Sequence, residues 1–243
     1  MIKAAHVLSG FMLLQCVGAR SEGLPLRVCV SDQAAAPFTY PDREGLSHRT
    51  IRAAASKLQQ AVLFEVKPRK RCLAEAQAGQ VDALAMAGST RELTATLAYP
   101  MRGDAIDPQR GFGPYQAYLV RYRGATLEWN GQQITGASLP VLYPAGMTAA
   151  HEKLQALGVD GNGSFKSAKD MGMLLLNRRA QAIVLREADA LAVARDGAMR
   201  DQLELMQPAF FSINIYVPFS RNYYEAHREF VEKFWDELGR QQK

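Results

Sequence analysis

Residues 71–92, RCLAEAQAGQVDALAMAGSTRE, combine the two kinds of element that decide the fold of this chain. The first eight residues have the composition of a helix, and Gly79 is a common residue just past a helix end. The apolar run from Val81 to Met86 is interrupted only by Asp82, so it predicts a buried strand. The stretch is therefore a helix that leads directly into a strand.

The residues before this stretch show the same alternation. Apolar runs at 26–30 and 61–66 predict two further strands. Between them, Ile51 and Leu58 share the buried face of a helix that Ser47 is placed to cap. The order strand, helix, strand, helix, strand requires parallel pairing with right-handed crossovers. We therefore expect an α/β fold with a mostly parallel sheet flanked by helices.

The pattern restarts after a segment rich in glycine and proline, and it predicts a second α/β unit. An aromatic strand that also carries arginine is expected first, over residues 115–122. The remaining predicted elements are strands at 139–143, 182–185, 203–206 and 213–217, and helices at 148–157, at 167–177 with Ser167 as its cap, and at 223–240.

Two such units predict a molecule of two lobes joined by two crossovers. We expect residues 20–114 and 213–243 to form lobe 1 and residues 115–212 to form lobe 2. The cleft between them would be bounded by the C-terminal ends of strands and the N-termini of helices. Small ligands favour crevices of this kind.

The first 19 residues have the features of a secretory signal peptide. Lys3 lies in a short basic segment, an apolar stretch runs from Val7 to Val17, and small residues lead to a cleavage site after Ala19. The stretch is too short to span a bilayer. Cys16 offers the alternative of a lipoprotein, although the residues before it do not include the usual small one. We expect an exported, periplasmic protein.

Cys29 and Cys72 are the two cysteines that remain after this leader. Export would place them in an oxidising compartment, where a pair readily forms a disulfide. Cys29 lies in the first predicted strand, and Cys72 opens the helix after the second strand, so the two elements are neighbours in a parallel sheet. We expect a disulfide; two buried free thiols are the alternative.

Charge and motifs point away from nucleic-acid binding and catalysis. The formal net charge is +5, and the one basic cluster, residues 67–71, has no interleaved aromatics and is interpreted as a solvated face. The four histidines stand outside the spacings typical of catalytic or metal sites. We expect a non-catalytic monomer that uses no metal and no cofactor.

The whole chain after the leader resembles the extracellular solute-binding proteins of family 3, the amino-acid-type periplasmic receptors of ABC transporters. The stretches that carry the resemblance are LRVCVSDQAAAPFTYPDREGL at 26–46, residues 71–92 with LAYP at 97–100, LPVLYPAGMTAAHEKLQALGV at 139–159 and RRAQAIVLREADAL at 178–191. The resemblance implies a type II periplasmic-binding fold. It also implies a small-molecule solute held by closure of the two lobes, with an ABC permease or a membrane sensor as partner. A dehydratase-like enzyme on the same fold and a scaffold without a ligand are the alternatives.

The resemblance also implies a set of ligand positions, which are acidic, hydroxyl-bearing or glycine residues: Asp32, Ser89, Thr90, Gly146 and Thr148. The last two belong to a turn before a helix, whose N–H groups and partial positive charge suit an anion. Tyr40 and Tyr115 are the aromatic residues best placed to offer both a ring face and a hydroxyl.

Two charged positions depart from the pattern of that family. The arginine that holds an α-carboxylate falls at Leu93, and Arg91 replaces it only if the loop is re-registered. The acidic residue that pairs with an α-ammonium falls at Arg186. Like charges ~4 Å apart repel by about 4 kcal/mol at an effective dielectric of 20, roughly a thousandfold in affinity. An ordinary α-amino acid in the usual pose is therefore not expected. Two alternatives stay open: Arg186 contacts an anionic group of a small polar ligand, or Arg186 pairs with Glu187 or Asp189 and the cleft binds a neutral solute.

Overall fold

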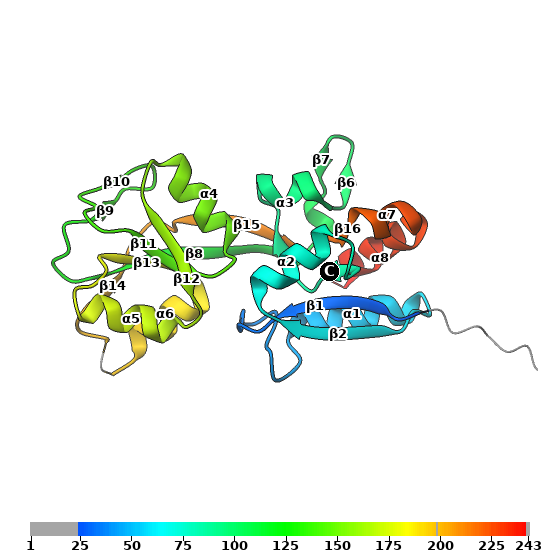
Figure 1. The fold of residues 1–243 in the computed structure, drawn as a ribbon, viewed down its shortest axis with the longest axis horizontal. Helices are drawn as coiled ribbons and strands as arrows, with labels where there is room; N and C mark the ends of the chain where they lie inside the picture. Colours follow the sequence, from blue (N-terminus) through cyan, green and yellow to red (C-terminus); the bar gives the residue numbers. More distant parts are fainter. Residues whose placement is uncertain (1–23, 198, 242–243) are drawn as a thin grey trace, which may run out of the picture.

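Two separate mixed sheets organise the chain, one in each half of the molecule shown in Figure 1. The computed structural model describes residues 24–197 and 199–241. The expected leader and Cys16 lie outside these described residues. The α/β class and the two-lobed architecture expected from the sequence are confirmed.

The first sheet has the strand order β2-β1-β3-β16-β5. Its strands are β1 (Leu26–Ser31), β2 (Val62–Lys67), β3 (Ala83–Leu84), β5 (Leu97–Ala98) and β16 (Phe219–Ser220). As the alternation of elements predicted, β1 pairs in parallel with both β2 and β3. The chain returns to this sheet near its C-terminus, because β16 pairs antiparallel with β3 and β5.

Helices cover both faces of the first sheet. They are α1 (Leu46–Lys57), α2 (Arg69–Gln77), α3 (Arg91–Thr96), α7 (Arg221–Ala226) and α8 (Arg228–Arg240). The apolar side of α8 is buried, and the Trp235 indole N–H donates a hydrogen bond to the Val217 carbonyl oxygen at 2.8 Å. The C-terminal helix therefore completes the core of the lobe in which the chain begins.

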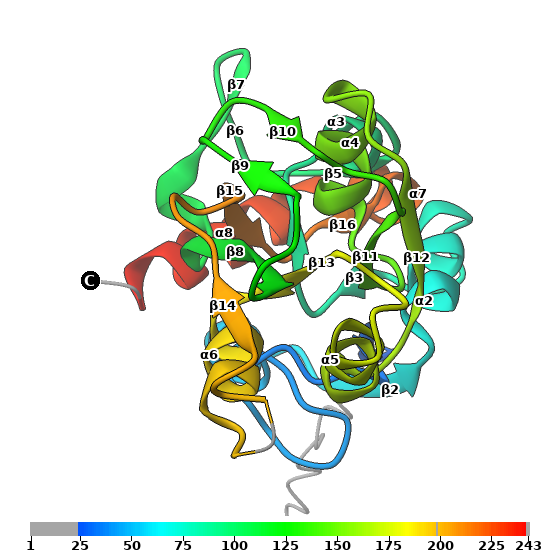
Figure 2. The ribbon, with the colours of Figure 1, turned by 90° about the vertical axis from the view of Figure 1, so that its left-hand side faces the viewer.

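The second sheet has the strand order β12-β11-β13-β8-β15-β4, and β14 also pairs with β8. Its strands are β4 (Ala87–Gly88), β8 (Gly113–Tyr122), β11 (Val141–Pro144), β12 (Gly161–Phe165), β13 (Ala182–Arg186), β14 (Leu203–Leu205) and β15 (Phe211–Tyr216). The helices packed on it are α4 (Thr148–Ala156), α5 (Ala168–Leu176) and α6 (Glu187–Arg195). Figure 2 shows α4 on one side of this sheet and α5 and α6 on the other, each over its own apolar cluster.

Three short elements complete the description. Two are hairpins, β6 (Met101–Arg102) with β7 (Ala105–Ile106) and β9 (Glu128–Trp129) with β10 (Ile134–Thr135), and the third is a 3₁₀ turn at Pro108–Arg110.

The two lobes are joined through β8 and β15, which pair antiparallel with Tyr115 opposite Ile213. Figure 1 shows both strands running between the two halves of the molecule. The expected lobe boundaries, at residues 114/115 and 212/213, fall inside these two strands. We propose that the lobes divide there.

Several local expectations were wrong. The expected strand at 81–86 is split, because β3 lies in the first sheet while β4 pairs with β15 in the second. The expected helix at 223–240 is interrupted at His227 into α7 and α8. Ser47 does not cap α1, because Gly45 is the N-cap and the Ser47 hydroxyl donates to the Ala85 carbonyl oxygen at 2.8 Å. The sequence reading also missed α3 and α6.

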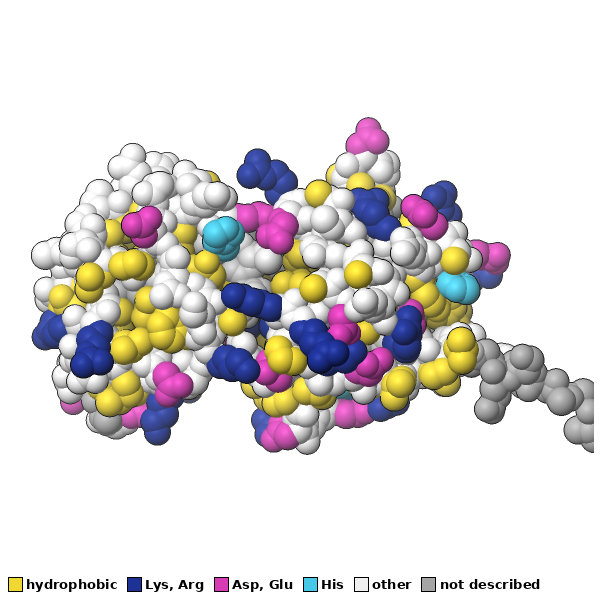
Figure 3. All heavy atoms as spheres, viewed as in Figure 1, with side chains coloured by type: hydrophobic (Ala, Val, Ile, Leu, Met, Phe, Trp, Pro, Cys, Tyr) yellow, Lys and Arg dark blue, Asp and Glu magenta, His cyan; other side chains and the backbone are white. Residues whose placement is uncertain are grey.

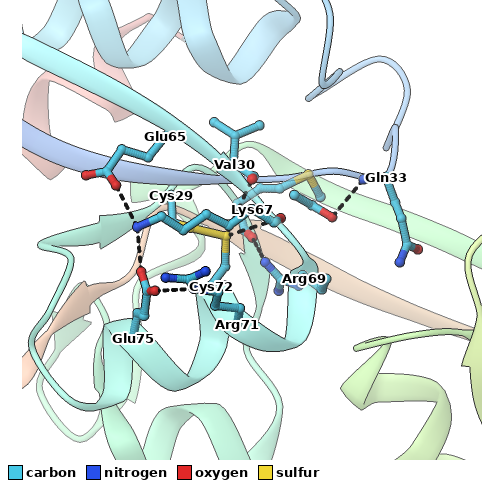
Figure 4. The surroundings of a disulfide bond; sticks show 11 residues. Cys29, Val30, Gln33, Glu65, Lys67, Arg69, Arg71, Cys72 and Glu75 are labelled. Carbon is cyan, nitrogen blue, oxygen red and sulfur yellow. Dashed lines mark hydrogen bonds and ion pairs between the residues drawn. A yellow bond between two sulfur atoms is a disulfide. The ribbon is translucent and has the colours of Figure 1, made fainter.

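Cys29 on β1 and Cys72 in the first turn of α2 form a disulfide with an S–S distance of 2.09 Å (Figure 4). Both residues are fully buried in the apolar cluster between α2 and the sheet. On one side of the bridge in Figure 4, the Lys67 ammonium lies 2.6 Å from carboxylate oxygens of Glu65 and Glu75. The disulfide therefore fixes the start of α2 to the central part of the sheet.

We expect replacement of both cysteines by serine to lower the free energy of unfolding by about 4 kcal/mol, because the bridge closes a loop across 43 positions. Urea unfolding of the oxidised wild type and of the Cys29→Ser/Cys72→Ser variant measures the difference. A reductant should destabilise the wild type and leave the variant unchanged. Equal unfolding midpoints for the two oxidised proteins would contradict this expectation.

Candidate functional site

The candidate site is a small pocket between the two lobes. About 40 Å³ of it is open to the centres of water molecules, which is room for roughly three waters. With the proposed lobe division, the lining residues on the lobe 1 side are Cys29, Ser31, Ala35, Thr39, Arg69, Ala85, Met86, Ala87, Gly88, Thr90, Ile213 and Ile215. Those on the lobe 2 side are Tyr115, Gly146, Met147, Thr148, Ala149 and Arg186. Figure 3 shows the lobes meeting at a narrowed waist, with basic side chains on its rims. The lining contains two arginines and no acidic residue.

Arg69, the first residue of α2, enters this pocket from lobe 1. In Figure 4 it lies on the opposite side of the disulfide from Glu65 and Glu75. Its Nη1 donates to the Met86 carbonyl oxygen at 3.1 Å, and no acidic side chain among the described residues forms an ion pair with it. Burial, followed by the positive charge of Arg186, lowers the pKa of Arg69 to about 10. The interpretation of residues 67–71 as a solvated face was therefore wrong for Arg69.

Arg186, the last residue of β13, enters from lobe 2. Its Nη1 lies 3.6 Å from Oδ2 of Asp189, three residues along the chain. Its Nε is buried and has no hydrogen-bond partner. In the alternative expected from the sequence, Arg186 pairs with Asp189. That ion pair involves only Nη1, so Nε remains a donor that a ligand could use.

Tyr115 connects this arginine to the strands that join the lobes. Burial, the largest effect, raises the pKa of Tyr115, and the positive charges of Arg186 and Arg69 act against this rise. The ring packs edge-on against Phe211 of β15, with centroids 6.2 Å apart. At neutral pH the hydroxyl is protonated, so the pocket presents one neutral and two cationic groups.

The turn at Gly146 brings lobe 2 against lobe 1. Gly146 has φ +75°, and a Cβ at this position would lie 2.4 Å from Cγ of Arg69. Glycine is therefore required both by the backbone and by the approach of the arginine stem. The turn leads into α4, whose first N–H groups have no acceptor within the helix. The chain thus directs a partial positive charge toward the same pocket.

The structure brings together five of the nine predicted ligand residues. Thr90, Tyr115, Gly146, Thr148 and Arg186 line the pocket. The Thr90 hydroxyl also caps α3, because it accepts a hydrogen bond from the Leu93 N–H at 3.3 Å.

The other four predicted residues are not in its lining. They are Asp32, Tyr40, Ser89 and Arg91. Asp32 forms an ion pair with Lys166 at 3.2 Å, and Tyr40 lies beneath the Arg43 guanidinium, 4.0 Å from the ring centroid. Arg91 is exposed on α3. The substitution of Arg91 for the missing family arginine is therefore not supported by its position.

A second, wider cavity adjoins the pocket. It has about 440 Å³ open to water centres and shares Gly146, Met147 and Thr148 with the first. The Tyr143 hydroxyl, hydrogen-bonded to Nδ1 of His151 at 3.0 Å, also lines this second cavity. In the described part of the chain, no group of three histidine, cysteine or acidic side chains is arranged to hold a metal ion.

No protein-family model and no curated protein matches the chain. Solved structures do. A histidine kinase sensor domain with similarity to periplasmic binding proteins has a TM-score of 0.68, at 13% identity over 92% of each chain. The glutamate-bound GluR0 ligand-binding core from Nostoc punctiforme has a TM-score of 0.65, at 12% identity over 89% of this chain and 94% of the other. This chain has the type II periplasmic-binding fold.

A third structure of this fold is the P235GK mutant of ArgBP from T. maritima, with a TM-score of 0.65 and 15% identity over 89% of this chain and 90% of the other. The similar structures are binding proteins and sensor domains. None of the helices in residues 24–197 and 199–241 is long and apolar enough to cross a membrane.

We expect anion binding to weaken above about pH 10, because Arg69 is cationic below its pKa of about 10 and neutral above it. Titration calorimetry with acetate and inorganic phosphate between pH 7 and 11 measures this dependence. In an Arg69→Met variant, any remaining affinity should lack the loss near pH 10. A wild-type profile that is flat through pH 11 would contradict the lowered pKa of Arg69. A pH profile that the variant reproduces would exclude Arg69 from the site.

Proposed function

We propose that this protein binds a small anionic solute in the pocket between its lobes. The observation that carries the proposal is the pair of arginines, Arg69 and Arg186, which face one pocket whose lining contains no acidic residue. The positive charge of Arg186 disfavours the charged form of Arg69, so an anion placed between the two side chains relieves an existing repulsion. An α-amino acid would bring its ammonium group into the same positive field.

The proposed cycle is closure of the two lobes around the solute outside the cytoplasmic membrane, after export by the predicted leader. A ligand that contacts both lobes stabilises the closed state by its differential affinity for that state. Arg69 and Arg186 come from different lobes, so one anion can contact both. We propose that an ABC-type permease then recognises the closed shape.

A second candidate is a ligand-sensing receptor for a membrane sensor. It is favoured by the similarity to a histidine kinase sensor domain and to the VFT2 domain of Bordetella pertussis BvgS, which has a TM-score of 0.61. Both candidates use the same binding step and differ in the protein that recognises the closed form.

We expect anions to raise the melting temperature of the protein and L-arginine to leave it unchanged, because the lining carries positive charge only. Thermal shift with acetate, succinate, phosphate and L-arginine measures this. Arg69→Met and Arg186→Met should each weaken the best anion by about 10- to 100-fold, the range for loss of a charge-assisted hydrogen bond.

The matched control is Arg71→Met, which removes the same charge two residues from Arg69 on the outer side of α2, where Arg71 pairs with Glu75. It should bind the anion as the wild type does. Stabilisation by L-arginine alone, or equal affinity in all three variants, would overturn the proposal.

A further inference from the structure

Two polar contacts join the lobes outside the pocket. The Glu152 carboxylate, on α4 in lobe 2, accepts hydrogen bonds from the N–H groups of Arg91 at 3.2 Å and Glu92 at 2.7 Å in lobe 1. The Lys166 ammonium, in lobe 2, lies 3.2 Å from Oδ2 of Asp32 in lobe 1. Both views of the fold place α3 and α4 next to each other.

The Glu152 contact is the better formed of the two. Both of its carboxylate oxygens are used, and both donors are backbone N–H groups at the start of α3. Thr90, the N-cap of α3, lines the pocket, so this contact also holds a pocket residue against lobe 2. The Lys166 side chain is 67% exposed, so its pair with Asp32 is a weak surface contact.

These contacts oppose a force that tends to open the empty cleft. Arg69 and Arg186 repel each other across the pocket, and closure brings them together because they belong to different lobes. Arg186 Nε is buried and lacks an acceptor, which adds to the cost of the arrangement. A ligand anion supplies the missing attraction, and the contacts of Glu152 and Lys166 oppose the repulsion from outside the pocket.

From this geometry we infer that Glu152, assisted by Lys166, is a positioning residue that closes the cleft from outside the pocket and keeps the ligand-free protein partly closed. Neither side chain lines the pocket, so both act through α3 and the loop after β1. The apparent affinity for a ligand is reduced by the fraction of molecules that are not competent to bind. Removing the contacts therefore weakens binding without removing any ligand contact. This inference rests on the proposed lobe closure.

The test compares Glu152→Gln/Lys166→Met with a control of equal charge change, Glu225→Gln/Lys169→Met. Neither control residue makes an ion pair with another described residue, and both are exposed. X-ray scattering of the ligand-free proteins should show a larger radius of gyration for the first variant and no change for the control. Affinity for phosphate or acetate should fall about fivefold in the first variant alone, which corresponds to about 1 kcal/mol. The urea unfolding midpoints of both variants should equal that of the wild type.

Scattering needs no ligand, so it separates failure of this inference from failure of the proposed function. An equal radius of gyration in wild type and both variants would overturn the role of Glu152, even if anions bind as proposed. The same holds if Glu152→Gln/Lys166→Met weakens binding only by lowering the unfolding midpoint. If no anion binds any of the proteins while the radius still increases in the first variant, the closure role stands and the anionic ligand is wrong.

Discussion

The pairing of β8 with β15 is the constraint on which the two-lobed arrangement depends. The chain passes from one lobe to the other through these two strands, which pair antiparallel from Gly113 to Ala117 along β8. A hinge of a few residues absorbs backbone change more readily than a packed core. Tyr115, on the same segment, reaches the pocket and Arg186. With the lobe division proposed above, the hinge and the candidate site would be parts of one strand.

Electrostatics decide which ligands this cleft can hold. The fold alone is compatible with many solutes, because similar structures include both a glutamate-bound core and an arginine-binding protein. The local charges are more restrictive, because two arginines and a helix start face the pocket. Oδ2 of Asp32 pairs with Lys166, and Oδ2 of Asp189 lies 3.6 Å from Nη1 of Arg186. Burial of a guanidinium without an acidic partner lowers the stability of the fold, and such groups cluster at binding and catalytic sites.

The sequence predicted the architecture well because hydrophobic periodicity and glycine positions follow from local physics. The strands around Val28, Val141 and Val184 and the Ser167 cap are where the pattern placed them. The role of Arg69 in the pocket could not be predicted in this way. Its neighbours in the sequence are also basic, and its side chain lies against Gly146 only in the folded chain. Its one local signal was its place directly after Pro68, at the point where β2 ends and a helix begins.

Short-range ambiguity explains the remaining errors. The apolar run 81–86 reads as one strand, yet the chain leaves the first sheet after Leu84 and pairs with β15 from Ala87 onward. Ser47 has the residue type of a helix cap, but its hydroxyl donates a hydrogen bond to the Ala85 carbonyl oxygen, 38 positions away in the sequence. Tertiary contacts determine both the split of this strand and the partner of the Ser47 hydroxyl, and a short stretch of sequence does not reveal such contacts.

The Cys29–Cys72 bridge has a further consequence for how the protein must be handled. Cys72 follows Arg69 by three residues, within the same helical turn, so the covalent link also anchors the turn that presents this arginine to the cleft. Material made in a reducing cytosol would have a looser attachment of that turn. Ligand screening on such preparations would understate affinity even where the fold itself is retained.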